Sequence, residues 1–449
     1  MVPRGGDGAM TGWDVIAAAS FAIWVYLLFG RGGFWREGVL PPAPVPSRWP
    51  GIAAVVPARD EAEFVGAALG SLLSQDYPGA FSVVLVDDHS TDGTPERARE
   101  TAEALGAAER LSIVPARRLP PGWTGKLWAI NEGLEAIERW TATAQGQHPS
   151  DTSCPRLSRA STDSFGAKED VDGRDKHGHD ENGENDVERR TSDTLSKREP
   201  IEPELILLTD ADIVHHATNL RELAARIEAG VDLASLMVKL RAESLAERFM
   251  IPAFVFFFEM LYPFSWIRDP AKRMAGAAGG CVLVRREVLR RIGGIAAIRG
   301  EIIDDCALGR AVKAGGPIWL GLSGQTRSLR RYPALGDIWR MVARTAYAQL
   351  GYSPVVLAAT VLGLALTFVA PVAVSLSGGG SAMLGLAAWA AMAVAYLPTL
   401  RLYGRSPGWA PLLPLIAIVY MAATLDSARR HWLGKGAEWK GRIQQQSRA

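Results

Sequence analysis

The stretch "ILLTDADI", from Ile206 to Ile213, joins an apolar run typical of a buried strand to two carboxylates one residue apart. Burying an unpaired charge is energetically costly. Asp210 and Asp212 therefore either lie in water at the end of the strand or bind a positively charged group. The rest of the sequence decides between these two interpretations.

Three earlier apolar runs have the same character, at residues 52–56, 81–86 and 111–114, and a helical pattern at residues 62–74 separates the first two. Continuous Val, Ile and Leu runs between helices are typical of a parallel sheet covered on both faces. Ligands of such sheets bind at the carboxyl ends of the strands, where the acidic residues occur here. We therefore predict an α/β fold with a Rossmann-like, mostly parallel sheet.

An apolar segment near the N-terminus, residues 12–30, contains a single acidic residue. It is long enough to cross a bilayer, which takes about 20 residues. Arg31 and Arg36 follow it, and this charge indicates that its C-terminal end is cytoplasmic. A cleaved signal peptide is the alternative, but the apolar part is too long and no small-x-small cleavage site follows. We expect an uncleaved transmembrane anchor.

The C-terminal region, residues 353–425, is also rich in apolar segments, and a basic tail follows at residues 426–449. The candidate membrane segments are residues 355–376, 382–397 and 409–425. Arg401 and Arg405 precede the last of them, whereas Arg429 and Arg430 follow it. Both pairs cannot be cytoplasmic if that segment crosses once, so the sequence leaves the number of spans open.

Residues 141–200 differ in composition from the rest of the chain, since they are polar, charged and nearly free of large apolar side chains. Such a segment buries too little surface to offset its ordering entropy, so we predict a disordered insertion. His177 and His179 could be metal ligands there. Residues 170–174 begin like a calcium loop, but Arg174 occupies a ligand position and breaks the pattern.

Charge and cysteine content exclude several classes of protein. The formal net charge is +1 and the sequence pI is about 7.8, which gives no reason to expect a nucleic-acid partner. Cys154, Cys281 and Cys306 are far apart and lack Cys-x-x-Cys spacing. They are typical of free thiols in a reducing compartment.

Polar clusters are expected at four strand ends. They are "VPARDE" at 56–61, "VDDHSTDGT" at 86–94, "TDAD" at 209–212 and "GEIIDDCAL" at 300–308. The second cluster alone is explained by an Asx turn that caps a helix. Four such clusters at one edge of a sheet indicate a common site.

In this order, "PARDE", "VLVDDHSTDGT", "TDAD" and "DDCALGR" resemble the inverting family-2 glycosyltransferases of GT-A fold. Three longer stretches resemble the branch of bacterial hopene-associated glycosyltransferases. They are "PPGWTGKLWAINEG", "GEIIDDCALGR" and "RSLRRYPALGDIWRMVARTAYAQLGYSP". The resemblance implies a GT-A domain at residues 50–350, interrupted by the insertion, between N-terminal and C-terminal transmembrane helices.

The resemblance also implies a chemistry for the acidic residues. A nucleotide-sugar donor, which we expect to be a UDP-sugar, releases a diphosphate that Mg²⁺ or Mn²⁺ stabilises. Asp210 and Asp212 are the predicted metal ligands, with Asp212 preferred. Asp305 matches the general base, and the neighbouring charge of Asp304 should raise one of the two pKa values. Glu301 is a second candidate for the base, and stabilisation of a helix N-terminus is the structural alternative.

Other matching positions concern the donor and the loop above it. The predicted nucleotide-binding residues are Pro57, Ala58, Arg59, Glu61, Asp87, Asp88, Lys126 and Arg344. Gly279 and Gly280 match the loop that closes over donor and acceptor. Processive synthases carry Gln-x-x-Arg-Trp, of which the stretch 341–345 keeps only Arg344. This departure favours transfer of a single sugar.

The sequence thus predicts an inverting, hexosyl-type glycosyltransferase that moves one sugar to a lipid hydroxyl, with a hopanoid implied by the resemblance. We expect a multi-pass protein of the bacterial inner membrane whose catalytic domain is cytoplasmic. Another lipid carrier, such as a polyprenyl phosphate or diacylglycerol, is the first alternative acceptor. A catalytically idle membrane scaffold of lipid synthesis is the second alternative. The apolar stretch 247–267 is either an interfacial helix near the lipid acceptor or a core helix.

Overall fold

The computed structural model describes residues 11–144, 202–434, 438–439 and 442–443. The chain divides into two compact units, one of residues 1–134 and 203–449 and the other of residues 135–202. Within the described part of the second unit, the chain is helical to Ala144. Most of the predicted insertion, with His177, His179 and Cys154, lies outside the described residues.

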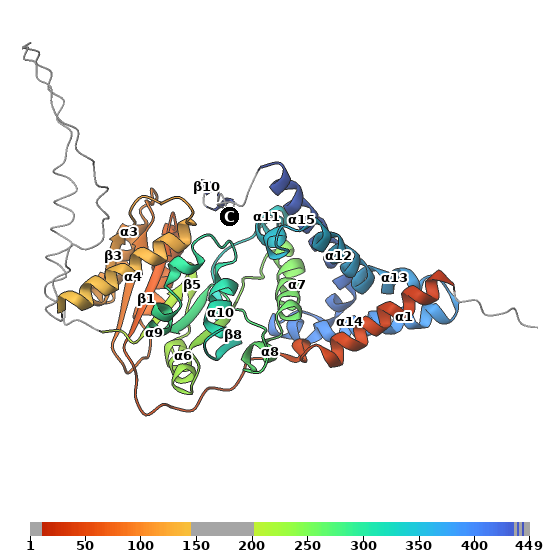
Figure 1. Ribbon diagram of the computed structural model, residues 1–449, viewed down its shortest axis with the longest axis horizontal. Coiled ribbons are helices and arrows are strands. Elements are labelled where there is room, and N and C mark those ends of the chain that lie inside the picture. The colour runs from red at the N-terminus through yellow and green to blue at the C-terminus, as the bar shows by residue number, and fades with distance from the viewer. Residues whose placement is uncertain (1–10, 145–201, 435–437, 440–441, 444–449) are drawn as a thin grey trace, which may run out of the picture. The chain divides into compact units, whose positions relative to one another are not determined.

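The first unit contains a mixed sheet with helices beside it (Figure 1). Its eight strands within the described residues have the order β3-β2-β1-β4-β7-β6-β8-β5. The strands are β1 (Ile52–Ala58), β2 (Phe81–Asp87), β3 (Leu111–Pro115), β4 (Leu205–Thr209), β5 (Ile213–Val214), β6 (Leu233–Lys239), β7 (Cys281–Arg285) and β8 (Ile318–Ser328). Neighbours from β3 to β4 are all parallel, whereas β7 is antiparallel to both β4 and β6. The predicted mostly parallel α/β sheet is confirmed.

Helices follow the strands in the chain, and some of them bury apolar faces against the sheet. They are α2 (Ala62–Leu73), α3 (Thr94–Ala104), α4 (Gly125–Ala144), α6 (Asn219–Glu228), α7 (Leu245–Leu261), α8 (Phe264–Arg268), α9 (Arg286–Arg291), α10 (Asp304–Lys313) and α11 (Leu335–Gln349). In α2, Val65, Leu69 and Leu72 are spaced for one helix face and belong to the same buried cluster as β1. Each such side chain contributes about 1.5–3 kcal/mol when buried.

Apolar helices occur at both end regions, as predicted. They are α1 (Gly12–Val25), α12 (Pro354–Leu364), α13 (Ala370–Ser375), α14 (Gly379–Leu402) and α15 (Leu413–Trp432). With the turns that extend them, four helices among the described residues are long and apolar enough to cross a membrane: Gly12–Gly30, Pro354–Ser375, Gly379–Leu402 and Pro407–Trp432. Trp24 joins the first two, since its Nε1 donates to Thr367 O at 2.7 Å and its ring meets Phe368 edge-on.

The apolar stretch 247–267 forms α7 and α8 and packs against the candidate membrane helices. The ring of Phe257 in α7 contacts Phe368 and Tyr420 edge-on, and Glu259 is buried. The predicted helix is therefore present and largely covered by protein. Its role near a lipid acceptor stays a prediction.

The strand register brings distant loops to one edge of the sheet. Ala58 pairs with Asp87, and Thr209 pairs with Cys281 at the start of the antiparallel β7. The loops after β1, β2 and β4 and the glycine loop before β7 therefore meet there. The cluster at 300–308 does not follow a strand, contrary to the prediction. It follows a 3₁₀ turn, Ile295–Ile298, and begins α10, whose N-terminal dipole favours acidic side chains.

Candidate active site

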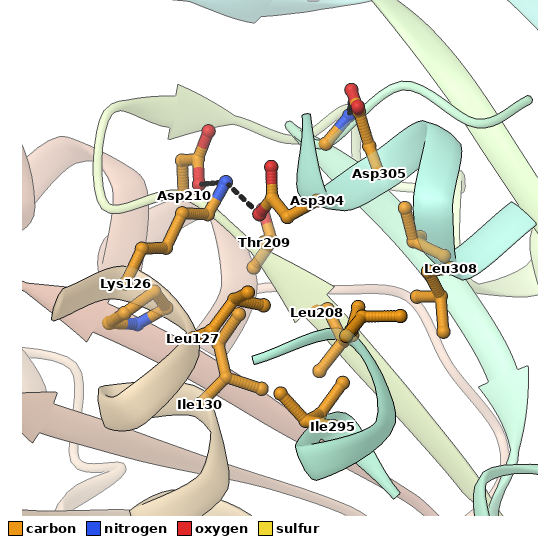
Figure 2. A pocket seen from close by; sticks show the side chains of 14 residues that line it. Lys126, Leu127, Ile130, Leu208, Thr209, Asp210, Ile295, Asp304, Asp305 and Leu308 are labelled. Atoms are coloured by element: carbon orange, nitrogen blue, oxygen red, sulfur yellow. Dashed lines mark hydrogen bonds and ion pairs between the residues drawn. The ribbon is translucent and has the colours of Figure 1, made fainter. Parts of the chain in front are cut away.

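Lys126 and two aspartates converge at the carboxyl edge of the sheet (Figure 2). Lys126 Nζ lies 2.8 Å from Asp210 Oδ1 and 3.4 Å from Asp304 Oδ2. The lysine comes from the first turn of α4, Asp210 follows β4, and Asp304 begins α10. Three segments that are distant in sequence thus supply one charged cluster.

A cavity lies beside this cluster and also contains Asp305. Figure 2 shows the charged groups on one side of the cavity and the apolar side chains on the other. The apolar lining consists of Leu127, Ile130, Leu208, Val282, Ile295, Ile298 and Leu308, and Pro57, Thr209 and Gly279 complete the cavity. Apolar walls beside converging charged groups are typical of sites for small ligands.

Asp305 is oriented by two backbone amides. Its Oδ2 accepts a hydrogen bond from Gly279 N at 2.9 Å, and its Oδ1 accepts one from Cys306 N at 2.7 Å. Burial and the negative charge of Asp304 raise the pKa of Asp305 to about 6, although Lys126 opposes the shift. A carboxylate with this pKa is mostly ionised at pH 7 and is a stronger base than an ordinary aspartate.

At Gly279 the glycine loop closely approaches the charged cluster. A Cβ at this position would lie 3.3 Å from Asp305 Oδ2 and 3.4 Å from Lys126 Nζ. The backbone of Gly276 in the same loop packs even more closely on Gly309 of α10. A Cβ on Gly309 would lie 2.8 Å from the carbonyl carbon of Gly276. Gly280 O also accepts a hydrogen bond from Thr209 Oγ1 at 2.8 Å, which ties the loop to the end of β4.

Lys126 remains positively charged in this environment. Burial would lower its pKa, but the attraction of Asp210 and Asp304 outweighs burial and raises it. The start of α4 is tied to the chain before the acidic pair, since Thr124 N donates to Arg299 O at 3.0 Å. This contact joins the segment before Lys126 to the segment before the α10 carboxylates.

Asp212 lies in a second ion-pair cluster, whose central residue, Arg330, was not predicted from the sequence. Arg330 Nε is 2.9 Å from Asp212 Oδ2, and Arg330 Nη2 is 2.7 Å from Glu61 Oε1. The guanidinium also lies 5.3 Å from the centre of the Phe64 ring. Arg330 therefore joins the first nucleotide-binding loop, predicted at 57–61, to the chain after β4.

Tyr332 extends this second cluster. Burial raises its pKa, while Arg330 and Arg344 are close enough to lower it. Arg344 is exposed on α11, so its predicted position near the donor site stays a prediction. Arg330 and Tyr332 follow the end of β8, and the polar run "RRY" after an apolar strand was the signal that could have identified them.

The loops after β1 and β2 hold each other in place. Asp88 is buried and pairs with Arg59, whose Nη1 lies 3.0 Å from Asp88 O and 3.4 Å from Oδ2. Asp92 accepts hydrogen bonds from Thr94 N at 3.1 Å and Ala62 N at 2.9 Å, so one carboxylate supports the starts of both α2 and α3. The Asx turn predicted for the 86–94 cluster is present, with Asp92 as the acceptor at the start of α3.

The remaining predicted residues lie at different distances from the cavity. Pro57 lines it, Ala58 is buried at the end of β1, and the Asp87 side chain is partly exposed at the end of β2. Asp87 Oδ1 accepts a hydrogen bond from Ser90 N at 3.3 Å. Glu301, the second candidate for the base, lines a separate cavity with Arg310, Gln349 and Tyr352. Glu301 therefore does not line the cavity that contains Asp305, and the choice of base stays a prediction.

The carboxylates of the site are the candidate ligands of a metal ion. No group of three His, Cys, Asp or Glu side chains with metal-binding geometry occurs among the described residues. Asp210 and Asp304 nevertheless share one cation, Lys126, and the Asp210 side chain is 37% exposed. Oxygen donors of this kind suit Mg²⁺ or Mn²⁺. Asp212 is 8% exposed and bound to Arg330, so it is the less accessible of the two predicted ligands.

Comparison with solved structures identifies similar chains. The mannosyltransferase PcManGT from Pyrobaculum calidifontis, in complex with GDP-Man and Mn²⁺, is 17% identical with a TM-score of 0.48, covering 94% of this chain and 99% of the other. Glucosyl-3-phosphoglycerate synthase from Mycobacterium tuberculosis, in complex with Mg²⁺ and UDP, is 15% identical with a TM-score of 0.35, covering 67% and 79%. TarS residues 1–349 from S. aureus, in complex with UDP-GlcNAc, are 14% identical with a TM-score of 0.34, covering 88% and 97%.

No curated protein sequence matches the chain. Residues 50–318 match the family described as "Glycosyltransferase like family 2". This match begins just before β1, ends at the start of β8 and includes Lys126, Asp210 and Asp305. It covers more than half of the 449 residues, so the chain belongs to the glycosyltransferase like family 2.

Proposed function

We propose that this glycosyltransferase moves one hexose-type sugar from a nucleotide-sugar, a UDP-sugar in our expectation, to the hydroxyl of a membrane lipid with inversion. The observation that carries the proposal is the convergence of Lys126, Asp210, Asp304 and Asp305 beside one cavity. The same chain has helices long enough to cross a membrane. A charged transfer site and apolar anchors in one chain suit a soluble donor and a lipid acceptor.

The charge of the cluster supports a site for a diphosphate with a cation. Three carboxylates and one ammonium leave a formal excess of two negative charges when all are ionised. A bare diphosphate would be repelled by this excess, whereas a divalent cation would neutralise it. When bound, Mg²⁺ or Mn²⁺ would stabilise the negative charge of the leaving diphosphate. Asp210 and Asp212 are the carboxylates that we propose for it, and Asp210 is the more accessible.

Asp305 is the proposed general base. It takes the proton of the acceptor hydroxyl as that oxygen attacks the sugar. The amides of Gly279 and Cys306 orient its carboxylate. Lys126 carries a fixed positive charge beside Asp210 and provides an electrostatic contact for the donor phosphates. The loops with Pro57, Ala58, Arg59 and Glu61 and with Asp87 and Asp88 are proposed to hold the nucleoside, with Arg344 near the diphosphate.

The acceptor proposal has a different basis. The candidate membrane helices support an apolar acceptor, and the resemblance to hopene-associated enzymes suggests a hopanoid. The absent Gln and Trp near Arg344 support one transfer rather than polymer synthesis. We propose a catalytic domain over residues 50–350 on the cytoplasmic side of a bacterial inner membrane, between membrane segments at 12–30 and 353–425.

A transfer assay tests the proposal. The full chain in proteoliposomes made with lipids of its source organism is supplied with Mn²⁺ and individual radiolabelled UDP-hexoses or GDP-mannose. We expect label in the organic phase from one donor, and mass spectrometry of that product identifies hopanoid, diacylglycerol or polyprenyl phosphate as acceptor. Absence of donor hydrolysis and of transfer with every donor would support the idle scaffold and contradict the proposal.

Two matched variants connect the assay to the site. Asp305→Asn should lower kcat by about 10²–10⁴-fold, the usual effect of removing a general base. Asp76→Asn should leave it unchanged, because Asp76 is exposed and pairs with Arg221 away from the cavity. Equal rates for the two variants would contradict the role of Asp305.

A further inference from the structure

The last apolar helix, Pro407–Trp432, begins and ends on the same side of the helices before it. Pro354–Ser375 and Gly379–Leu402 are joined by residues 376–378, and α13 packs against α14. Two crossing helices joined by so short a loop form a hairpin, so the start of the first and the end of the second lie on one side. Pro407–Trp432 leaves from the end of that hairpin.

The other end of α15 returns to the start of the same hairpin. The ring of His431 stacks on Tyr352 with the centroids 4.5 Å apart, and Trp432 meets Tyr347 edge-on. Tyr352 lies two residues before Pro354, where the first helix of the hairpin begins. Both ends of the helix therefore lie on the side from which the hairpin leaves.

One face of α15 is fixed to helices of the catalytic region. Tyr420 OH donates to Met250 O of α7 at 2.9 Å. Trp339 Nε1 of α11 donates to an Asp426 carboxylate oxygen at 2.9 Å, and Tyr347 N donates to Ser427 Oγ at 3.0 Å. These contacts span the second half of the helix. They hold it against α7 and α11.

The opposite face of the helix is apolar and exposed. Leu412, Leu415, Ile418 and Leu425 follow helical spacing, and each is 41–53% exposed. A helix with one face on protein and one apolar stripe uncovered suits the boundary between lipid headgroups and acyl chains. The 26 residues of this helix would also be long enough to cross the membrane. Helix length therefore does not distinguish a crossing helix from a surface helix, whereas the position of its two ends does.

We propose that Pro407–Trp432 lies along the membrane surface with its Leu412–Leu425 stripe in the lipid, and that only the other three candidate helices cross. In this arrangement the arginines before and after the last apolar helix no longer have to lie on opposite sides of the membrane. Arg401 and Arg405 before the helix and Arg429 and Arg430 after it all lie on one side, together with Arg31 and Arg36. It also fixes α7 and α11 at the bilayer surface, close to an apolar acceptor, and makes the chain after Gly434 leave on the catalytic side.

Cysteine labelling in cells tests this topology. Cys154→Ser provides a background, since Cys281 and Cys306 are buried. Ser377→Cys reports the hairpin loop, Ser406→Cys the start of the last helix and Lys435→Cys the position after its end. With a membrane-impermeant maleimide, we expect Ser377→Cys to react in intact spheroplasts, and the other two only after permeabilisation. Reaction of Ser406→Cys and Lys435→Cys from opposite sides would overturn the proposal.

A second measurement avoids substitutions in the chain. Green fluorescent protein fused after Ala449 of the full protein should fluoresce, because it folds in the cytoplasm and not after export through the general secretion pathway. A dark fusion that is present in the membrane, while Ser406→Cys reacts only after permeabilisation, would overturn the proposal. If both reporters around α15 react only from outside, the cytoplasmic orientation in the proposed function fails, and a surface helix without crossing is retained.

Discussion

Replacing Lys126 with methionine removes the positive charge between two carboxylates at nearly constant volume. Lys126 Nζ lies 2.8 Å from Asp210 and 3.4 Å from Asp304, and it lowers the pKa of Asp305. Without it, the three carboxylates repel one another and the donor diphosphate loses an electrostatic contact. We expect Lys126→Met to reduce activity and to raise the pKa of the base.

The magnitudes follow from these distances. At an effective dielectric constant of about 20, each ion pair has a gross attraction of about 5–6 kcal/mol before the cost of desolvation. Removing one partner of a fully buried pair costs about 3–5 kcal/mol. Asp210 is 37% exposed, so solvent screens part of this energy and we expect a stability loss of about 1–2 kcal/mol. Loss of one group that stabilises the leaving charge should lower kcat by about 10²–10³-fold.

The assay is the pH dependence of kcat/KM for sugar transfer in proteoliposomes. The acid limb of Lys126→Met should move up by about one pH unit, because the nearby positive charge that lowers the pKa of Asp305 is lost. Lys126→Arg should recover part of the rate, because it restores a positive charge. Lys272→Met should have the rate and pH profile of the natural protein, because Lys272 is exposed and contacts the ring of Trp266. An unchanged rate and pH profile in Lys126→Met would refute the role of the cluster.

Four further predictions concern the same site. In the natural protein, kcat/KM should fall as the pH decreases through about 6, because Asp305 must be deprotonated to act as a base. Asp304→Asn should move this acid limb to lower pH, because it removes the negative charge that raises the pKa of Asp305. Profiles of kcat/KM against pH measure both effects. Arg330→Met should raise the KM for the donor by about 10–100-fold, since Asp212 loses the cation that holds it; initial rates at varied donor concentration measure this. Gly279→Ala should lower kcat by about tenfold, or 1.4 kcal/mol, because the new methyl group would press on Asp305; saturating single-turnover rates measure it. Chelation with EDTA should abolish transfer, and Mg²⁺ or Mn²⁺ should restore it in the same assay.

Control variants and contradicting results can be named for these predictions. Gly363→Ala should keep full activity because its methyl group would meet nothing within 4 Å, so equal losses in the two glycine variants would exclude a specific effect at the site. Arg330→Lys should recover part of the donor affinity. A flat pH profile between 5 and 8 would argue against Asp305 as the base, and full activity in EDTA would argue against the metal.

The parallel part of the sheet could be predicted because its strands are continuous apolar runs. The runs at 52–56, 81–86, 111–114 and 205–208 all become strands, each extended by one or two residues. Their polar C-terminal neighbours also meet, since parallel register places strand ends at one edge. The local sequence pattern was therefore sufficient to predict these strands and the meeting of the polar residues that follow them.

The ion pairs of the site could not be predicted in this way. Arg330 lies 118 residues after its partner Asp212, and only the position of β8 in the sheet brings them together. Lys126 matched a nucleotide-binding position, but its contact with Asp304 depends on the loop that ties Thr124 to Arg299. The course of the last apolar helix likewise depends on tertiary contacts, because composition gives the same pattern for a crossing and for a surface helix.

The most direct test of the central claim is a structure of the membrane-embedded protein with UDP and Mn²⁺. We predict the ion in contact with Asp210 and the diphosphate beside Lys126, with Asp305 facing the space left for the acceptor. A nucleotide bound away from the cavity between α4 and α10, with Lys126 still paired to Asp210 and Asp304, would contradict the account.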